Sequence, residues 1–126
     1  MVEDILSDKN LTNIIKNYLG KDAKLDTISL DTTKLNSHSN SISEQWHYDN
    51  VGNRIKMFFF LNSTKLINTE FIEGTNRIKH KKFNTLETRI SEEEINRIYK
   101  KKIFCPSRSK AIIFDTNAYH RGNYAK

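Results

Sequence analysis

The stretch from Arg54 to Leu61, RIKMFFFL, constrains the fold of this chain more than any other feature. It combines a β-branched residue and three consecutive aromatic residues with no glycine or proline, which is typical of a β-strand. A second run, KAIIFD from Lys110 to Asp115, has the pattern of a buried strand. A chain of 126 residues is long enough for one modest core. We therefore predict a single domain over residues 1–126 that is mainly β.

Two segments have the pattern of a helix. In the first twenty residues apolar side chains recur at near-helical spacing, and Gly20 stands where a C-terminal cap is expected. A break in this helix is predicted near Asp8. From Glu92 to about Lys101 acidic residues fill the first turn and lysines the last, and Ser91 with Glu94 forms a capping box.

Three shorter segments are predicted as strands: residues 24–35, 45–49 and 69–72. A polar loop is expected at 36–43 and a turn at 50–53. Several short strands with one N-terminal helix and one inserted helix indicate a small α+β domain, built as a sandwich or a jelly roll.

The net charge of +6 comes mostly from lysine, with 15 Lys against 6 Arg among abundant Asn and Ile, a mixture typical of an AT-rich genome. The lysine-rich runs at 79–82 and 100–102 have the charge to contact phosphates. However, the chain has neither the aromatic-interleaved motifs of RNA-binding modules nor a helix-turn-helix pattern. We therefore favour a solvated basic surface over nucleic-acid binding.

The sequence also predicts where the protein is found. Its one cysteine, Cys105, permits no internal disulfide, which is typical of a reducing compartment. The N-terminus MVEDILSDKN lacks the basic flank and apolar core of a secretory signal. No apolar run approaches the length of a membrane span. We expect a cytoplasmic protein without a membrane anchor.

The residues most suggestive of chemistry are His47 and Asp49, two apart in an extended segment. Residues i and i+2 of a strand point to the same side, so an imidazole nitrogen and a carboxylate can meet at one point. Two histidines and one carboxylate form the facial triad that holds Fe(II) and leaves positions open. The second histidine is predicted to be His120, just after the strand at 110–115. The alternative is a hydrogen-bonded surface pair and an unrelated loop histidine.

His38 and His80 are poorer candidates for the third ligand. His38 lies in a Ser/Asn-rich loop, and His80 lies in a run of lysines.

Three segments in order resemble the phytanoyl-CoA dioxygenase-like family of Fe(II)/2-oxoglutarate-dependent oxygenases. They are YLGKDAKLDTISLDTTKL, QWHYDNVGNRIKMFFFLN and AIIFDTNAYHRGN, and FIEGTNRIKH matches a Gly-Thr loop of the family loosely. The resemblance covers most of residues 17–123. It implies a double-stranded β-helix, or jelly roll, with His47, Asp49 and His120 as iron ligands and catalytic residues.

The resemblance also implies an activity. Fe(II), 2-oxoglutarate and molecular oxygen are the expected cofactor and co-substrates, with a small-molecule substrate. Halogenating members of the family lack the carboxylate ligand, so Asp49 implies hydroxylation with release of succinate and CO2.

One departure from the family leaves two alternatives open. The arginine that binds the far carboxylate of 2-oxoglutarate in the family lies farther past the second histidine than the six residues that follow His120. Arg121 is expected to point to the opposite face, so Lys56 is the predicted anchor for this anion. The chain is then either an active oxygenase or a non-catalytic truncated remnant that binds metal or a partner. A missing last strand would expose a sheet edge for self-association.

Overall fold

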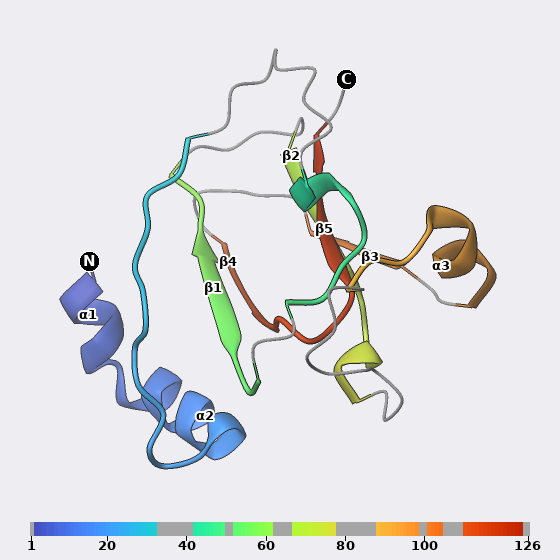
Figure 1. Cartoon of the computed structure of the whole chain (residues 1–126). Helices are drawn as coiled ribbons and strands as arrows, with labels where there is room; N and C mark the ends of the chain where they lie inside the picture. The colour runs from blue at the N-terminus through green and yellow to red at the C-terminus, as the bar shows by residue number, and fades with distance from the viewer. Residues whose placement is uncertain are drawn as a thin grey trace. The chain divides into compact units, whose positions relative to one another are not determined.

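The computed structural model describes residues 2–32, 42–49, 52–61, 67–77, 88–98, 101–104 and 110–124 (Figure 1). The chain divides into two compact units, Met1–Thr33 and Lys34–Lys126, and each is described by itself. Within the described residues, no helix has both the length and the apolar character that crossing a membrane requires.

The first unit contains two helices, α1 at Val2–Ser7 and α2 at Lys9–Leu19. Asp8 separates them and caps α2, because its side-chain oxygen accepts hydrogen bonds from the Asn10 and Leu11 N–H groups at 2.9 and 3.1 Å. Gly20 ends α2 at a φ of 108°, and its N–H donates to a carbonyl of the last turn. The predicted helix and its break are therefore confirmed.

The strand predicted at 24–35 is wrong over the part that the structure describes. Residues 24–32 form no ladder, and Leu25, Ile28 and Leu30 are all more than half exposed. A strand requires a neighbour for its backbone N–H and C=O groups, and the regular elements described in this unit are helices, whose backbone groups already pair internally. Residues 33–41, which include most of the predicted polar loop, lie outside the described part.

The second unit contains two antiparallel sheets (Figure 1). In one, β1 (Ile55–Phe59) pairs with β4 (Ala111–Asp115), and Ile55 lies opposite Asp115. In the other, β2 (Ile67–Ile72) lies between β3 (Lys101–Phe104) and β5 (His120–Tyr124). One α-helix, α3 (Glu92–Ile98), and two short 3₁₀ helices at Ile42–Glu44 and Thr75–Arg77 complete the elements described here. The predicted α+β class and three of the predicted strands, 54–61, 69–72 and 110–115, are confirmed.

The segment Gln45–Asp49 differs from the predicted short strand. His47 forms two isolated antiparallel bridges, one with Arg89 and one with His120. Pairing therefore joins this segment to β5 on one side and to the residues before α3 on the other.

The core beside the three-stranded sheet consists of Trp46, Ile72 and Ile95, each at most 1% exposed. Ile95 belongs to α3, which begins as predicted: the Ser91 hydroxyl accepts a hydrogen bond from the Glu94 N–H at 3.1 Å. Because Ile72 lies on β2, this cluster holds α3 against one face of the sheet. The opposite face of the same sheet carries the candidate site.

Candidate metal centre

His47 and His120 lie directly opposite each other on adjacent chain segments. The His47 N–H donates to the His120 carbonyl at 3.0 Å, and the His120 N–H donates to the His47 carbonyl at 2.8 Å. Paired residues of antiparallel strands project to the same face, so the two imidazoles lie side by side, with ring centroids 4.3 Å apart.

Asp49 completes the cluster from the end of the first segment. Its N–H donates to the Thr116 carbonyl at 2.9 Å, and the Thr116 N–H donates to the Arg54 carbonyl at 3.1 Å. Asp49 Oδ1 lies 3.7 Å from Nε2 of each histidine. The potential donor atoms of the three side chains all lie within 4.8 Å of one another. The structure thus brings together the three residues predicted as a metal triad.

The hydrogen bonds of the two imidazoles fix which nitrogen is left for a metal. Nδ1 of His47 lies 2.7 Å from the Gln45 carbonyl, and Nδ1 of His120 lies 2.9 Å from the Ala118 carbonyl. A carbonyl only accepts, so each Nδ1 carries the proton and donates. Each Nε2 then has a lone pair directed toward Asp49, the arrangement found in metal-ligating histidines.

The electrostatics keep the triad in the form that a cation requires. Burial lowers the pKa of His47 below its ordinary value and lowers the pKa of His120 from 6.5 to about 4. For Asp49, burial acts to raise the pKa, but the Lys56 ammonium bound to its carboxylate outweighs this, and the pKa lies below its ordinary value. At neutral pH the site therefore presents two neutral imidazoles and one carboxylate.

The pKa of His120 predicts a pH-dependent stability of the metal-free chain. Because the ordinary pKa of 6.5 applies when the chain is unfolded, the unfolded state binds more protons between pH 6.5 and about 4. The free energy of unfolding should therefore fall as pH decreases through this window, by about 2–3 kcal/mol. Urea denaturation at pH 7, 5.5 and 4.5 measures it. The lowered pKa of Asp49 acts at lower pH, where its carboxylate becomes protonated. An equal loss in His120→Gln would contradict this assignment.

The loop that leads to His120 is held by side chains from three places. The Asp115 carboxylate accepts hydrogen bonds from the Asn117 N–H at 2.8 Å and from the Asn76 amide at 3.2 Å. The Asn117 amide donates to the Gly52 carbonyl at 2.7 Å. Asp115 therefore shapes the turn before His120.

Thr75 makes the most buried of these contacts. Its hydroxyl is buried, donates to the Ile72 carbonyl at 2.7 Å and accepts from the Tyr119 N–H at 2.9 Å. Thr75→Val keeps the shape but leaves both groups unpaired, so we expect a loss of about 1–3 kcal/mol in the free energy of unfolding. Chemical denaturation measures this, and Thr27→Val, at an exposed threonine, is the control. No loss beyond that of the control would mean that water replaces the hydroxyl.

Lys56 and Arg121, the two cations considered for an anionic co-substrate, lie in different places. Lys56 Nζ is 2.6 Å from Asp49 Oδ2, the carboxylate oxygen farther from the histidines, and its side chain is 32% exposed. Arg121 points to the opposite face of β5, as expected, where its Nε lies 2.6 Å from Glu70. Lys56 thus belongs to the site and Arg121 does not.

The donor set fits a divalent first-row metal. Two imidazole nitrogens and one carboxylate oxygen are the ligands of non-haem iron sites, and the His47–Asp49–His120 cluster can hold a metal ion. His38 and His80 lie outside the described residues. No local sequence pattern indicates the contact of Thr75 with Tyr119 or that of Glu92 with Trp46, because these partners lie 44 and 46 residues apart in the chain.

Comparisons of the chain with protein-family models, with curated proteins and with solved structures found no match. Support for a function therefore comes from the geometry of the site and from the chain's own residues.

Proposed function

We propose that this protein is an Fe(II)/2-oxoglutarate-dependent dioxygenase that hydroxylates a small molecule and releases succinate and CO2. The observation that carries the proposal is the triad of His47, Asp49 and His120, with both Nε2 atoms unprotonated and facing one carboxylate oxygen. The same proposal includes a relationship of the chain to the phytanoyl-CoA dioxygenase-like oxygenases and a catalytic role for the three residues.

The order of strand pairing supports a jelly roll. The segment around His47 pairs with the start of β5, β1 pairs with β4, and β2 pairs with β3, so the pairs are nested like the arms of one long hairpin. In addition β2 pairs with β5, which rolls the hairpin onto itself. Rolled antiparallel pairing of this kind is the connectivity of a jelly roll, or double-stranded β-helix. The triad would then lie where two of these nested pairs end.

In the proposed reaction the triad would bind the metal, and nearby aromatic rings would shield it from water. The triad would hold Fe(II) on one side and leave coordination positions for 2-oxoglutarate and oxygen. When bound, iron and 2-oxoglutarate supply the oxidising chemistry that places one oxygen atom of O2 on a carbon. Phe114 packs edge-on against His120 at 5.1 Å, and Phe58 packs against Phe114 at 5.4 Å. These rings exclude water from one side of the ligands.

Lys56 is the proposed partner of the 2-oxoglutarate dianion. A carboxylate that enters a partly buried site requires a cation, and the Lys56 ammonium is held at the triad by Asp49. About a third of the Lys56 side chain is exposed, which leaves the ammonium accessible to a second carboxylate. Lys56 would then bridge the metal ligand and the co-substrate.

One observation favours a second function, metal binding without turnover. Arg121 is bound by Glu70 and Glu92 on the other face, and Lys56 is already bound by Asp49. A chain with these cations committed to internal partners would bind a metal but hold 2-oxoglutarate weakly. This is the remnant hypothesis drawn from the sequence.

Anaerobic titration with Fe(II) and 2-oxoglutarate separates these functions. The proposed dioxygenase should develop the visible charge-transfer band of the chelated iron complex, and His47→Ala should abolish it. Lys56→Met should weaken 2-oxoglutarate binding by about tenfold or more while iron still binds, because one charge-assisted hydrogen bond is lost. Lys110→Met, at an exposed lysine, is the matched control. Iron binding with no band at any 2-oxoglutarate concentration would favour the second function.

A further inference from the structure

We propose that Glu92 is a positioning residue for the metal centre and acts from the opposite face of the sheet. Its carboxylate links the two chain segments that carry His47 and His120. This inference rests on the metal site of the proposed function, and it assigns a role to a residue that contacts neither a ligand atom nor a metal.

Glu92 contacts the two residues that lie next to the histidines in the chain, Trp46 and Arg121. Successive side chains of an extended segment alternate between faces, so Trp46 and Arg121 project away from the site while His47 and His120 project into it. The Arg121 guanidinium lies over the Trp46 ring, 4.6 Å from its centroid. The neighbours of the two ligands therefore contact each other on the far face, as the ligands do on the near face.

One oxygen atom of Glu92 joins these two neighbours. Trp46 Nε1 donates to Glu92 Oε2 at 2.7 Å, and an Arg121 guanidinium N–H donates to the same oxygen at 2.5 Å. Both are hydrogen bonds to a charged acceptor, which are stronger than neutral ones. Trp46 is 1% exposed, and this hydrogen bond pairs its buried indole N–H.

The link adds to a short backbone connection, since two hydrogen bonds join His47 and His120 at this point. His47 and His120 form an isolated bridge, which is a single residue pair outside the longer strand ladders. Metal sites require their ligands within about 0.5 Å of the productive position. A second attachment one residue away, on the other face, restrains both the separation and the twist of the pair.

Glu92 is itself held in place by the start of α3. Ser91 caps the helix and Ile95, one turn later, is fully buried in the core with Trp46. The Glu92 side chain is 43% exposed and borders a pocket of about 450 Å³ together with Trp46 and Arg121. Shortening it leaves no buried cavity, so the variant is expected to fold.

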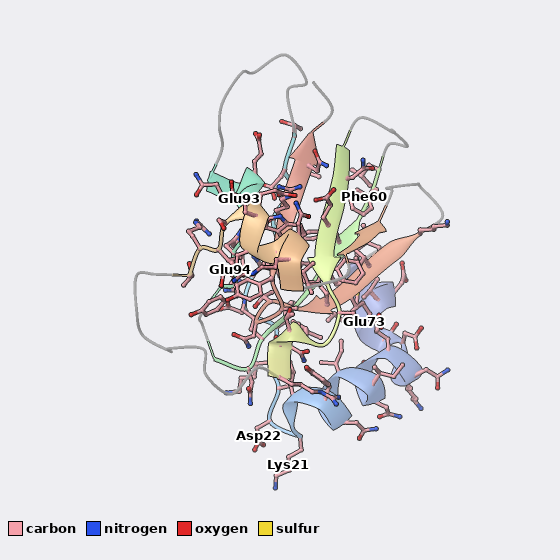
Figure 2. The ribbon with its side chains drawn as sticks, turned by 90° about the vertical axis from the view of Figure 1, so that its right-hand side faces the viewer. Lys21, Asp22, Phe60, Glu73, Glu93 and Glu94 are labelled. Carbon is pink, nitrogen blue, oxygen red and sulfur yellow. The ribbon has the colours of Figure 1, made fainter. Side chains whose placement is uncertain are left out.

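Cobalt(II) titration followed by visible absorption tests the proposal without turnover, since both affinity and the shape of the d–d bands report on ligand geometry. We expect Glu92→Ala to weaken cobalt binding by about tenfold and to change the band shape, because outer residues that orient ligands contribute about 10–100-fold. Glu92→Gln keeps an acceptor for the indole and should restore part of the loss. Glu93→Ala removes the same charge from the next position of α3, labelled in Figure 2, and should bind like the wild type.

Trp46→Phe provides a second variant, which keeps an aromatic ring but removes the N–H and makes the side chain smaller. It should weaken cobalt binding by about threefold to tenfold with the same direction of spectral change. Equal affinity and equal spectra in Glu92→Ala and Glu93→Ala would overturn the role of Glu92 while leaving the metal site intact. Absence of cobalt binding in the wild type would overturn both the site and the inference. Thermal unfolding of each metal-free variant shows that it is folded.

Discussion

His120→Ala should reduce the affinity of the chain for Fe(II) or Mn(II) by about a hundredfold or more. Residues that only orient metal ligands contribute about 10–100-fold, and His120 supplies a donor atom itself. Its Nε2 lies 3.7 Å from Asp49 Oδ1, and its Nδ1 proton is committed to the Ala118 carbonyl. Alanine would leave two donors, and a residual site of this kind binds divalent ions weakly.

Isothermal titration calorimetry under anaerobic conditions measures this affinity. His38→Ala, at a histidine not assigned to the site, is the matched control and should bind like the wild type. Asp49→Ala should lose as much as His120→Ala. Wild-type affinity in His120→Ala would show that the ion binds elsewhere and that the proximity of the three side chains has another cause.

Arg121→Met should cause the largest loss of stability, about 3–5 kcal/mol in the free energy of unfolding. Glu70 is 4% exposed, and Arg121 Nε binds one of its carboxylate oxygens while the Asn123 amide binds the other. Among the described residues, removal of the guanidinium leaves the neutral Asn123 amide as the partner of this buried carboxylate. Methionine keeps most of the apolar contact with Trp46, so the loss reports the charge.

Urea denaturation at neutral pH measures this loss, with Arg97→Met in the exposed part of α3 as control. The control should change the free energy of unfolding by no more than about 0.5 kcal/mol. The double variant Arg121→Met with Glu70→Gln should recover much of the loss, because the unpaired charge is then absent. A small effect in the single variant would mean that water reaches Glu70.

The strands with a strong local pattern could be predicted from the sequence, and those set by pairing could not. β1 and β4 are rich in apolar side chains, so composition alone indicated them. β5, HRGNY, contains a glycine and polar residues, and it is a strand because it pairs with β2. Conversely the alternating segment at 24–32 has a strand-like composition but joins no ladder in the described part of the chain.

The same distinction holds for the candidate site. His47 and Asp49 lie two apart, and the end of a strand places His120, so spacing and strand order were enough to predict the triad. The roles of Thr75 and Glu92 depend on contacts between distant segments, which a single sequence does not encode in any local pattern. Lys56 was predicted as a site residue, but its ion pair with Asp49 is seen only in the structure.

The most direct test of the metal centre is X-ray absorption at the iron K-edge on the chain loaded anaerobically with one equivalent of Fe(II). We predict an ion bound by two imidazoles and at least one carboxylate, with nitrogen and oxygen donors at about 2.0–2.2 Å. The imidazole scattering should fall by half in His47→Gln and in His120→Gln. An iron environment of oxygen donors alone, unchanged in both variants, would contradict the assignment of His47, Asp49 and His120 as the metal site.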